Sequence, residues 1–331
     1  MGALFCSGII STGSYVPDNI VTNKDLENIV ETTDEWIVTR TGIRERRIAH
    51  ANMATSDMAV IAAKRAMKES GLAPEEIDLI LVATVTPDNN VPSTACIVQY
   101  SIGAVNAAAF DINAACSGFI YGIITAKQFV ATGTYENILV IGAECLSRFT
   151  DWKDRNTCVL FGDGAGAVVI SRVDSEVGIL SQYMGADGSG GELLKVEAGG
   201  SRKPASLETV EQGLHYFYMD GSEVFKFAVR IMASAAMEAV KLAGLTRECV
   251  DYLVPHQANI RIIEGARKRL NLTKDKVYVN LDRYGNMSAA SIPVALDGAV
   301  REGLIKRGHN IVLVGFGGGL TWASALIKWA Y

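Results

Sequence analysis

Residues 62–78 read AAKRAMKESGLAPEEID, and residues 235–251 read AAMEAVKLAGLTRECVD. With this offset of 173, eight of the 17 positions are identical without a gap. Each copy has the apolar spacing of a helix, which ends at a Gly-Leu pair before an apolar run typical of a strand. A helix, a turn and a strand that recur together indicate an internal duplication.

The same offset reaches beyond these two segments. It sets Asn137 and Ile138 on Asn310 and Ile311, and it sets Asn113 on Asn286, whereas the stretches in between match poorly. A chain of 331 residues exceeds the size at which one hydrophobic core usually stops growing. We therefore predict two similar halves, residues 1–175 and 176–331. Because no Gly-, Pro- or Ser-rich linker divides them, we expect the halves to pack as one body.

Short apolar runs alternate with helical patterns along the chain. The runs lie at 77–82, 137–141, 250–254 and 310–314, and the helical patterns lie at about 56–70, 117–131, 221–243, 259–270 and 288–303. Strands that are apolar on both faces are typical of sheets covered by helices on each side. The alternation predicts an α/β fold with mainly parallel strands.

Composition excludes several classes of protein. The chain is 49% hydrophobic and contains only 7 Pro, which argues against intrinsic disorder and collagen. Its net charge of -5 argues against a nucleic-acid-binding protein, which is usually basic. No apolar run is long enough to span a membrane. The segment 1–6 lacks the basic and apolar parts of a secretory signal, so we expect a cytoplasmic protein.

The six cysteines form no C-x-x-C pair, and the four histidines form no H-E-x-x-H motif. Zinc and thioredoxin-like sites are therefore not indicated, and we expect no metal. We expect most of the cysteines to be small, buried apolar residues.

Three polar residues lie where an apolar strand is predicted to end. Cys116 follows such a strand and precedes a helix, whose positive end should lower the pKa of a thiol and favour the thiolate. His256 directly follows a second strand, and Asn286 lies at a third strand-to-helix passage. Each residue alone is also explained by packing, by a satisfied polar contact or by a turn. In α/β sheets, however, ligands bind beyond the carboxyl ends of strands, so the three could share one cavity.

Two glycine-rich segments and one basic segment complete the candidates. Residues 162–167 resemble a dinucleotide fingerprint but lead into a strand instead of a helix, so we reject that interpretation. Gly318, in a run of three glycines, either forms a tight hairpin or offers a backbone N–H to an oxyanion. Past His256, a face that carries Arg261 and Lys268 suits an acidic or phosphorylated partner, or is simply solvated.

These motifs together resemble the β-ketoacyl-acyl carrier protein synthase III family, the initiating condensing enzymes of type II fatty acid synthesis in the thiolase superfamily. The resemblance covers the whole chain. Its most specific motifs are Val254-Pro255-His256-Gln257-Ala258-Asn259 and the Cys/His/Asn set, because the related elongating enzymes use two histidines with the cysteine. Further motifs lie at residues 34–44, 115–118, 161–166, 285–290 and 316–319.

The resemblance implies a five-layered α-β-α-β-α thiolase fold with duplicated halves, and a homodimer. It implies that Cys116 takes an acyl group from acyl-CoA, and that His256 and Asn286 stabilise the enolate formed when malonyl-acyl carrier protein loses CO₂. The N–H groups of Cys116 and Gly318 would form the oxyanion hole. Acyl-CoA would be a substrate, and no cofactor is implied.

The resemblance also assigns the contacts with the two substrates. Trp36 and Arg155 would enclose the adenine of CoA, and Arg40 and Thr41 would contact its nucleotide part. The acyl carrier protein would dock on Lys226, Gln257, Ala258, Asn259, Ile260, Arg261, Lys268 and Arg269. One departure concerns Val91, at a position in the acyl pocket where acetyl-selective members can carry Phe; the smaller side chain would admit longer or branched primers.

Three other functions compete with this one. A polyketide-type synthase of the same branch would share the fold and differ in its substrates. A papain-type Cys-His-Asn hydrolase would need a C-G-[SA]-C-[WY] motif near its N-terminus, which this chain lacks. A non-catalytic scaffold would transfer no acyl group.

Overall fold

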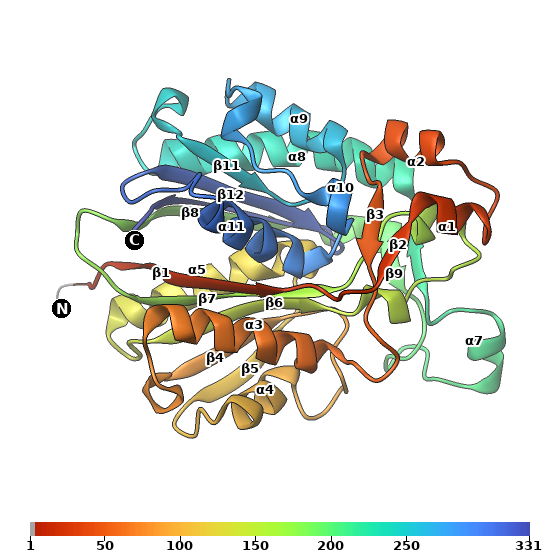
Figure 1. Ribbon diagram of the computed structural model, residues 1–331, viewed down its shortest axis with the longest axis horizontal. Helices are drawn as coiled ribbons and strands as arrows, with labels where there is room; N and C mark the ends of the chain where they lie inside the picture. Colours follow the sequence, from red (N-terminus) through yellow and green to blue (C-terminus); the bar gives the residue numbers. More distant parts are fainter. Residues whose placement is uncertain (1–3) are drawn as a thin grey trace.

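The computed structural model describes residues 4–331; Met1, Gly2 and Ala3 of the N-terminal segment lie outside the described residues. Figure 1 shows five layers. Helices α8 and α9 lie outermost on one side, followed by a sheet, the central helices α5 and α11, a second sheet, and finally α3 and α4. This arrangement confirms the predicted α-β-α-β-α fold.

The first sheet has five strands in the order β1-β7-β6-β4-β5. Strands β4, β5 and β6 are parallel to one another, whereas β7 runs antiparallel to both β6 and β1. The strand bounds are Ser7–Tyr15 (β1), Leu79–Ala83 (β4), Ala108–Ile112 (β5), Ile138–Glu144 (β6) and Gly164–Arg172 (β7).

The second sheet repeats this arrangement with four strands in the order β11-β12-β13-β8. Only β11 and β12 are parallel. The bounds are Gly178–Ala186 (β8), Tyr252–Pro255 (β11), Asn310–Gly317 (β12) and Thr321–Lys328 (β13). Both sheets are therefore mixed, and the expectation of mainly parallel strands is wrong. The four predicted runs, β4, β6, β11 and β12, are parallel strands, as is β5, whereas β1, β7, β8 and β13 pair antiparallel with their neighbours.

Two short pairs of strands stand apart from the two sheets, namely β2 (Ile20–Thr22) with β3 (Glu45–Arg47), and β9 (Leu194–Val196) with β10 (Phe217–Met219).

The helices that cover the sheets lie close to the predicted positions. The helix bounds are Asn23–Glu27 (α1), Asp34–Thr41 (α2), Thr55–Ser70 (α3), Thr94–Ile102 (α4), Gly118–Thr132 (α5), Arg155–Cys158 (α6), Leu207–Glu211 (α7), Gly221–Leu242 (α8), Ile260–Arg269 (α9), Leu281–Tyr284 (α10) and Ser291–Arg301 (α11). No described helix is long and apolar enough to cross a membrane.

The duplication is visible in matching hydrogen bonds. The Asp78 carboxylate accepts from the backbone N of Asn137 at 2.9 Å, and 173 positions later Asp251 accepts from the backbone N of Asn310 at the same distance. Both sheets also pack on the same central helices, α5 and α11, so one apolar core lies between them. The division at residue 175 remains a prediction; all strands of one sheet lie within 7–172 and those of the other within 178–328.

Each half also contains a tight elbow before its central helix. We call residues 113–117 the first elbow and residues 286–290 the second elbow. Ala115 has φ of 47° and Ser288, 173 positions later, has φ of 44°. A positive φ is uncommon for residues other than glycine and marks a sharp, specific turn. The repeat therefore extends to the backbone shape of the two elbows.

The strand predicted before Asn286 is absent. The first elbow follows β5, but the segment before the second elbow is the short helix α10, and the pairing with β11 is reduced to a single bridge between Leu253 and Val277. Residues 277–280 thus lie where the second half would hold its copy of β5. Cys116 and Asn286 share equivalent elbows without following equivalent strands.

Candidate active site

The first elbow places Cys116 beneath the second sheet. A short 3-10 turn, residues 115–117, carries the cysteine from β5 into α5, and the side chain is buried. The end of β12 passes directly over this turn, because a Cβ on Gly317 would lie 2.5 Å from the backbone N of Cys116. A side chain at residue 317 would therefore displace the elbow.

Burial determines the acidity of this cysteine. Removal from water raises the pKa of the Cys116 thiol to about 12; the Ser288 side chain offsets part of this effect and the charge of Glu144 adds to it. The expectation of a lowered pKa at a helix N-terminus is therefore wrong, because desolvation of the thiolate exceeds the attraction of the helix end. The group is a thiol at neutral pH.

His256 reaches the same place from β11. Its backbone N donates to the carbonyl of Val314 at 2.8 Å, which anchors it to β12. A Cβ on Gly315 would lie 3.3 Å from the carbonyl O of Cys116 and 3.6 Å from Cβ of His256, so the two residues flank one glycine. The imidazole stacks edge-on against Phe316 with ring centroids 5.7 Å apart. Both ring nitrogens are buried and have no hydrogen-bond partner among the described residues.

Burial lowers the pKa of His256 to about 3, so we expect its ring to stay neutral. The ring resonances of His256, assigned by their loss in His256→Gln, should not move between about pH 5 and pH 8. Folding stability should fall as the pH drops below about 6.5, because the unfolded chain then takes up a proton that the buried ring refuses. An NMR titration of histidine-labelled protein measures the first effect; a midpoint near neutrality for His256 would contradict the prediction.

The second elbow fixes the orientation of Asn286. Its backbone is bonded on both sides to the loop before β7, since its N donates to Leu160 O at 2.8 Å and its O accepts from Gly162 N at 3.0 Å. Its side-chain Oδ1 accepts from the backbone N of Ser288 at 2.9 Å. Because only an oxygen can accept from this N–H, the amide is set with its Nδ2 group left as the donor.

A cavity of about 420 Å³ opens at the two elbows. Cys116, Ser288 and Gly318 line it, so the thiol, the second elbow and the predicted oxyanion-hole glycine face one space. His256 and Asn286 do not line it; His256 flanks Cys116, and Asn286 is bonded to Ser288. The remaining wall is mostly apolar, and consists of Val85, Asn113, Ala114, Ala115, Leu146, Phe161, Leu194, Lys195, Val196, Phe217, Gly319 and Thr321.

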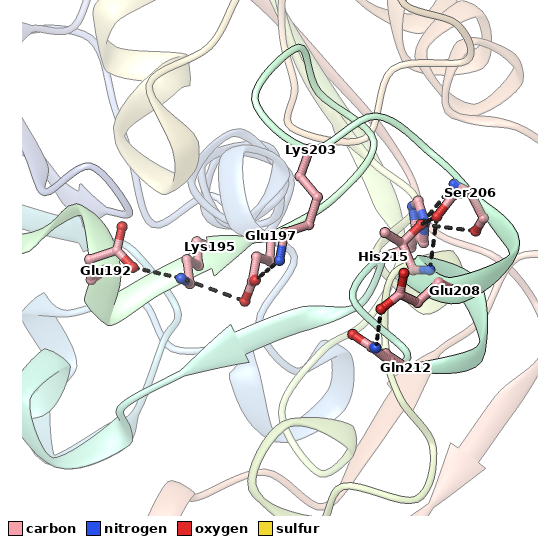
Figure 2. Close-up of polar contacts among 9 residues, drawn as sticks. Glu192, Lys195, Glu197, Lys203, Ser206, Glu208, Gln212 and His215 are labelled. Carbon is pink, nitrogen blue, oxygen red and sulfur yellow. Dashed lines mark hydrogen bonds and ion pairs between the residues drawn. The ribbon is translucent and has the colours of Figure 1, made fainter.

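The antiparallel pair of strands β9 and β10 supplies part of the wall of this cavity. Figure 2 shows Lys195 of β9 between two carboxylates, Glu192 at 2.6 Å and Glu197 at 3.7 Å, with Lys203 paired to Glu197 in turn. Single exposed ion pairs contribute little, but a chain of them orients several side chains together. The Lys195 ammonium is therefore directed at carboxylates, and the wall stays compatible with an apolar ligand.

The predicted CoA residues gather around α2. Two guanidinium groups lie over the Trp36 ring, that of Arg40 4.4 Å and that of Arg155 4.8 Å from its centroid. Thr41, in contrast, is buried, and its hydroxyl donates to Ile37 O at 2.7 Å and accepts from Ile43 N. Thr41 thus terminates α2, and its predicted contact with CoA gains no support.

The predicted carrier-protein face is only partly accessible. Arg261, Lys268 and Arg269 are exposed on α9, and Lys226 is exposed on α8 beside Glu223. Ala258 and Ile260 are half-buried, and Asn259 caps α9 and donates to Arg40 O at 2.8 Å.

The prediction for Gln257 is wrong. The residue is fully buried, its Nε2 donates to Pro255 O at 2.8 Å, and its Oε1 accepts from Asn280 N at 3.0 Å. Its amide thus joins β11 to the chain before α10, and no atom is left for a partner protein.

Burial also corrects the expectation for the cysteines. Cys116, Cys145 and Cys158 are buried, but Cys6, Cys96 and Cys249 are exposed. Glu144, the last residue of β6, was not among the residues predicted for the site, and it is wholly buried beside the second elbow. The sequence pattern could have indicated Glu144 as a candidate, because it is a single acid at the carboxyl end of the apolar run 138–143. His256 occupies the same position relative to its own strand.

Two mixed sheets around shared helices, with a buried cysteine and a neutral histidine at the strand ends, define a condensing enzyme of the thiolase class. Comparison with known proteins gives the family. Family models described as "3-Oxoacyl-[acyl-carrier-protein (ACP)] synthase III" and as its C-terminal part match residues 110–188 and 240–329. The chain belongs to this family of acyltransferases, as its motifs indicated.

Named relatives agree over nearly the whole chain. The "Beta-ketoacyl-[acyl-carrier-protein] synthase III" of Caldanaerobacter subterraneus subsp. tengcongensis is 64% identical over 98% of both chains. The crystal structure of 3-oxoacyl-[acyl-carrier-protein] synthase III from Aquifex aeolicus is 50% identical, covers 98% of this chain and 100% of its own, and has a TM-score of 0.91. The priming β-ketosynthase of the R1128 polyketide pathway is 37% identical, covers 100% and 98%, and also has a TM-score of 0.91.

Proposed function

We propose that this chain joins an acyl-CoA primer to malonyl-acyl carrier protein with loss of CO₂, to give the 3-oxoacyl-acyl carrier protein that starts fatty acid synthesis. The observation that carries the proposal is one cavity lined by Cys116, Ser288 and Gly318, with His256 and Asn286 beside it. Acyl-CoA is a substrate and no resident cofactor is needed, because a thioester is activated by hydrogen-bond donors alone. The cytoplasm, where both substrates are made, is the proposed location.

In the first step the sulfur of Cys116 attacks the thioester carbonyl of acyl-CoA. A bond forms between Sγ and the acyl carbon, the bond to the CoA sulfur breaks, and the thiol proton leaves with CoA. The N–H groups of Cys116 and Gly318 receive the oxyanion of the tetrahedral intermediate. A thioester suits the next step, because it remains reactive toward a carbon nucleophile.

In the second step malonyl-acyl carrier protein loses CO₂ and becomes an enolate. The Nδ2 group of Asn286 and one N–H of His256 donate to the enolate oxygen. A neutral imidazole is the appropriate form of this donor, since one of its nitrogens always carries a proton. The enolate carbon then attacks the acyl group on Cys116, a C–C bond forms, and the Cys116 sulfur leaves and recovers a proton.

Both substrates enter, in this proposal, by the face where α2 meets α9. The stack of Arg40, Trp36 and Arg155 provides planar and cationic surfaces for the adenine and phosphates of CoA. Asn259 joins α9 to Arg40, so the basic side chains Arg261, Lys268 and Arg269, together with Lys226, border the same entrance. An acidic carrier protein would be held there with its phosphopantetheine arm directed toward Cys116.

Val91 adds a proposal on primer choice. It lies in the loop after β4 and is 85% exposed, so its side chain fills no cavity of its own chain. A residue so placed is able to reach the acyl pocket of a second protomer. A Val at that point leaves more room than an aromatic residue would, which favours longer or branched primers.

The test of the proposed function is a reconstituted condensation with purified protein. With malonyl-acyl carrier protein as acceptor, we expect 3-oxoacyl-acyl carrier protein and one CO₂ per turnover from acetyl-, isobutyryl- and hexanoyl-CoA. Mass spectrometry of the carrier protein measures the product. A strict preference for acetyl-CoA would contradict the role of Val91, and no product from any primer would contradict the function.

The likeness to the R1128 priming β-ketosynthase supports a second candidate, priming of a polyketide. The acceptor distinguishes the two in the same assay. Turnover with malonyl-CoA in place of malonyl-acyl carrier protein, or with primers that fatty acid synthesis does not use, would favour a polyketide-type role.

We also propose a homodimer formed along β5. This strand is an edge of the first sheet, and its Phe110 is 40% exposed. Helix α4, which packs on β5, exposes Tyr100 at 86%, and Val91 and Val105 are exposed nearby in the chain. An unpaired edge with large apolar side chains is suited to pair with a second copy.

Phe110→Glu should therefore convert a dimer into a monomer, because it places a charge on the paired edge. Light scattering coupled to size-exclusion chromatography gives the mass. The control is Leu207→Glu on α7, an apolar side chain that is 85% exposed and lies outside the first sheet, which should leave the dimer intact. A monomeric unsubstituted protein, or a Phe110→Glu dimer, would contradict the proposed interface.

A further inference from the structure

Glu144 is a buried acid that the proposed chemistry does not use. It ends β6, is wholly inaccessible to solvent, and forms no ion pair with any Lys or Arg in residues 4–331. Burying an unpaired carboxylate is costly, and replacement by an apolar residue would often be harmless or favourable. The packing of β6 therefore does not explain why a carboxylate is buried at residue 144.

The contacts of this carboxylate all come from donors. The hydroxyls of Thr84 and Thr86 lie at 3.2 and 2.6 Å, and the backbone N of Val85 lies at 3.1 Å. The Thr86 hydroxyl itself accepts from the backbone N of Cys145, so its own hydrogen points to Glu144. This set of donors suits an ionised carboxylate, which only accepts.

The fourth donor connects Glu144 to the site. The backbone N of Ala289, in the second elbow, donates to it at 3.4 Å. The fit between β6 and this elbow is tight, because a Cβ on Gly142 would lie 2.2 Å from the carbonyl O of Ala289. Since α11 begins directly after this elbow, the carboxylate also lies toward the positive end of an 11-residue helix.

The second elbow packs on the first, which brings the charge of Glu144 near Cys116. This charge is one of the influences that raise the pKa of Cys116. Among residues 4–331, the groups that act on the carboxylate are the hydroxyls of Thr84, Thr86 and Ser288, two backbone N–H groups, and one titratable group, the Cys116 thiol. Burial raises the pKa of Glu144 itself to about 7, although these donors oppose the rise. Its charge therefore changes near neutral pH.

We propose that Glu144 is a positioning residue that ties the second elbow, and with it Asn286, to β6, and whose negative charge restrains formation of the Cys116 thiolate. The inference rests on the proposed role of Cys116. It makes one carboxylate act on both halves of the site, through a hydrogen bond to one elbow and through charge on the other. The restraint is present when Glu144 is ionised and is relieved when it is protonated.

Alkylation of Cys116 by iodoacetamide tests the charge without any substrate. The rate is followed against pH from the Cys116 peptide by mass spectrometry, with the exposed Cys249 peptide as internal reference. In the unsubstituted protein the logarithm of the rate should rise with unit slope, flatten around pH 7 as Glu144 ionises, and rise again. Glu144→Gln should match it below about pH 6, lack the flattening, and react roughly tenfold faster above about pH 8, a shift of one pKa unit.

Two further variants separate the effect of the charge at residue 144 from the effect of its side-chain length and from a general disturbance of the fold. Glu144→Asp keeps the charge but has a shorter side chain, which should weaken the hydrogen bond to the backbone N of Ala289. The flattened pH profile of alkylation should therefore remain. The kcat of condensation should fall about tenfold or more, with little change in KM. Asp297→Asn removes another buried carboxylate, on α11 and bonded to Thr12, and should leave both measurements within about twofold.

The outcomes decide between a specific role and a loosened fold. A Glu144→Gln protein that reacts faster at every pH shows loosening, and one that retains the flattening shows that another group causes it; either result overturns the proposal. Full kcat in Glu144→Asp overturns the positioning part, and this variant also carries the test if Glu144→Gln does not fold. A failure of the proposed function would appear instead as a lack of acylation in the unsubstituted protein.

Discussion

Cys116→Ala should abolish transfer of the acyl group from acyl-CoA to the protein. The unsubstituted protein mixed with acetyl-CoA should gain one acetyl group, and the variant should gain none, because the only thiol that lines the described cavity is gone. Overall condensation should fall on the order of 10⁴-fold or more, as it does when an enzyme loses its nucleophile. Intact-protein mass spectrometry measures the adduct directly.

A matched control comes from the same sheet. Cys145 is also buried, directly after β6, and burial raises the pKa of its thiol to about 11. It does not line the cavity at the elbows, so Cys145→Ala should acylate like the unsubstituted protein. An adduct that persists in Cys116→Ala would refute the assignment of the nucleophile, and loss of the adduct in Cys145→Ala would show that cysteine substitutions disturb the fold.

His256→Ala and Asn286→Ala should separate the two halves of the reaction. Each removes one donor to the enolate, which should lower condensation with malonyl-acyl carrier protein about 10²- to 10³-fold. Acylation of Cys116 should persist, since its oxyanion is held by backbone N–H groups that neither substitution removes. The measurements are the acyl-protein mass after the first step and the rate of product formation after the second.

The controls for these variants are a histidine and an asparagine far from the elbows. His309→Ala and Asn310→Ala lie at the opposite end of β12, where Asn310 donates to the carbonyl of Cys249. Both steps should proceed at normal rates in these proteins. Equal loss of acylation and condensation in Asn286→Ala would instead mean that the second elbow has collapsed onto Cys116, and the assignment of Asn286 as an enolate donor would fail.

Much of the fold follows from local patterns. The predicted runs at 77–82, 137–141, 250–254 and 310–314 correspond to β4, β6, β11 and β12, because strands covered on both faces must be apolar throughout. The antiparallel strands β1 and β8 were not predicted, whereas β7 and β13 were expected only as strands that follow glycine-rich segments. The segment before Asn286 was assigned as a strand because its sequence aligns with β5, but in the second half that strand is reduced to one bridge.

The site divides in the same way. Motifs indicated Cys116, His256 and Asn286, and the structure places Cys116 and Asn286 on two matching elbows, with His256 after β11 beside Cys116. Motifs failed for Gln257 and gained no support for Thr41, because each of these polar side chains forms its hydrogen bonds inside the protein. They failed also for the acidity of Cys116, since a helix end is local but desolvation depends on every residue packed around the thiol.

The sequence by itself determined the duplication, the layered α/β class and the three residues proposed to carry the chemistry, because these depend on spacing and on residue type. Only the tertiary structure decided that the cysteine is a buried thiol, that the histidine is neutral and that Glu144 lies between the elbows. Burial and the approach of segments distant in sequence set the charge of a group, and neither is written in the local order of residues.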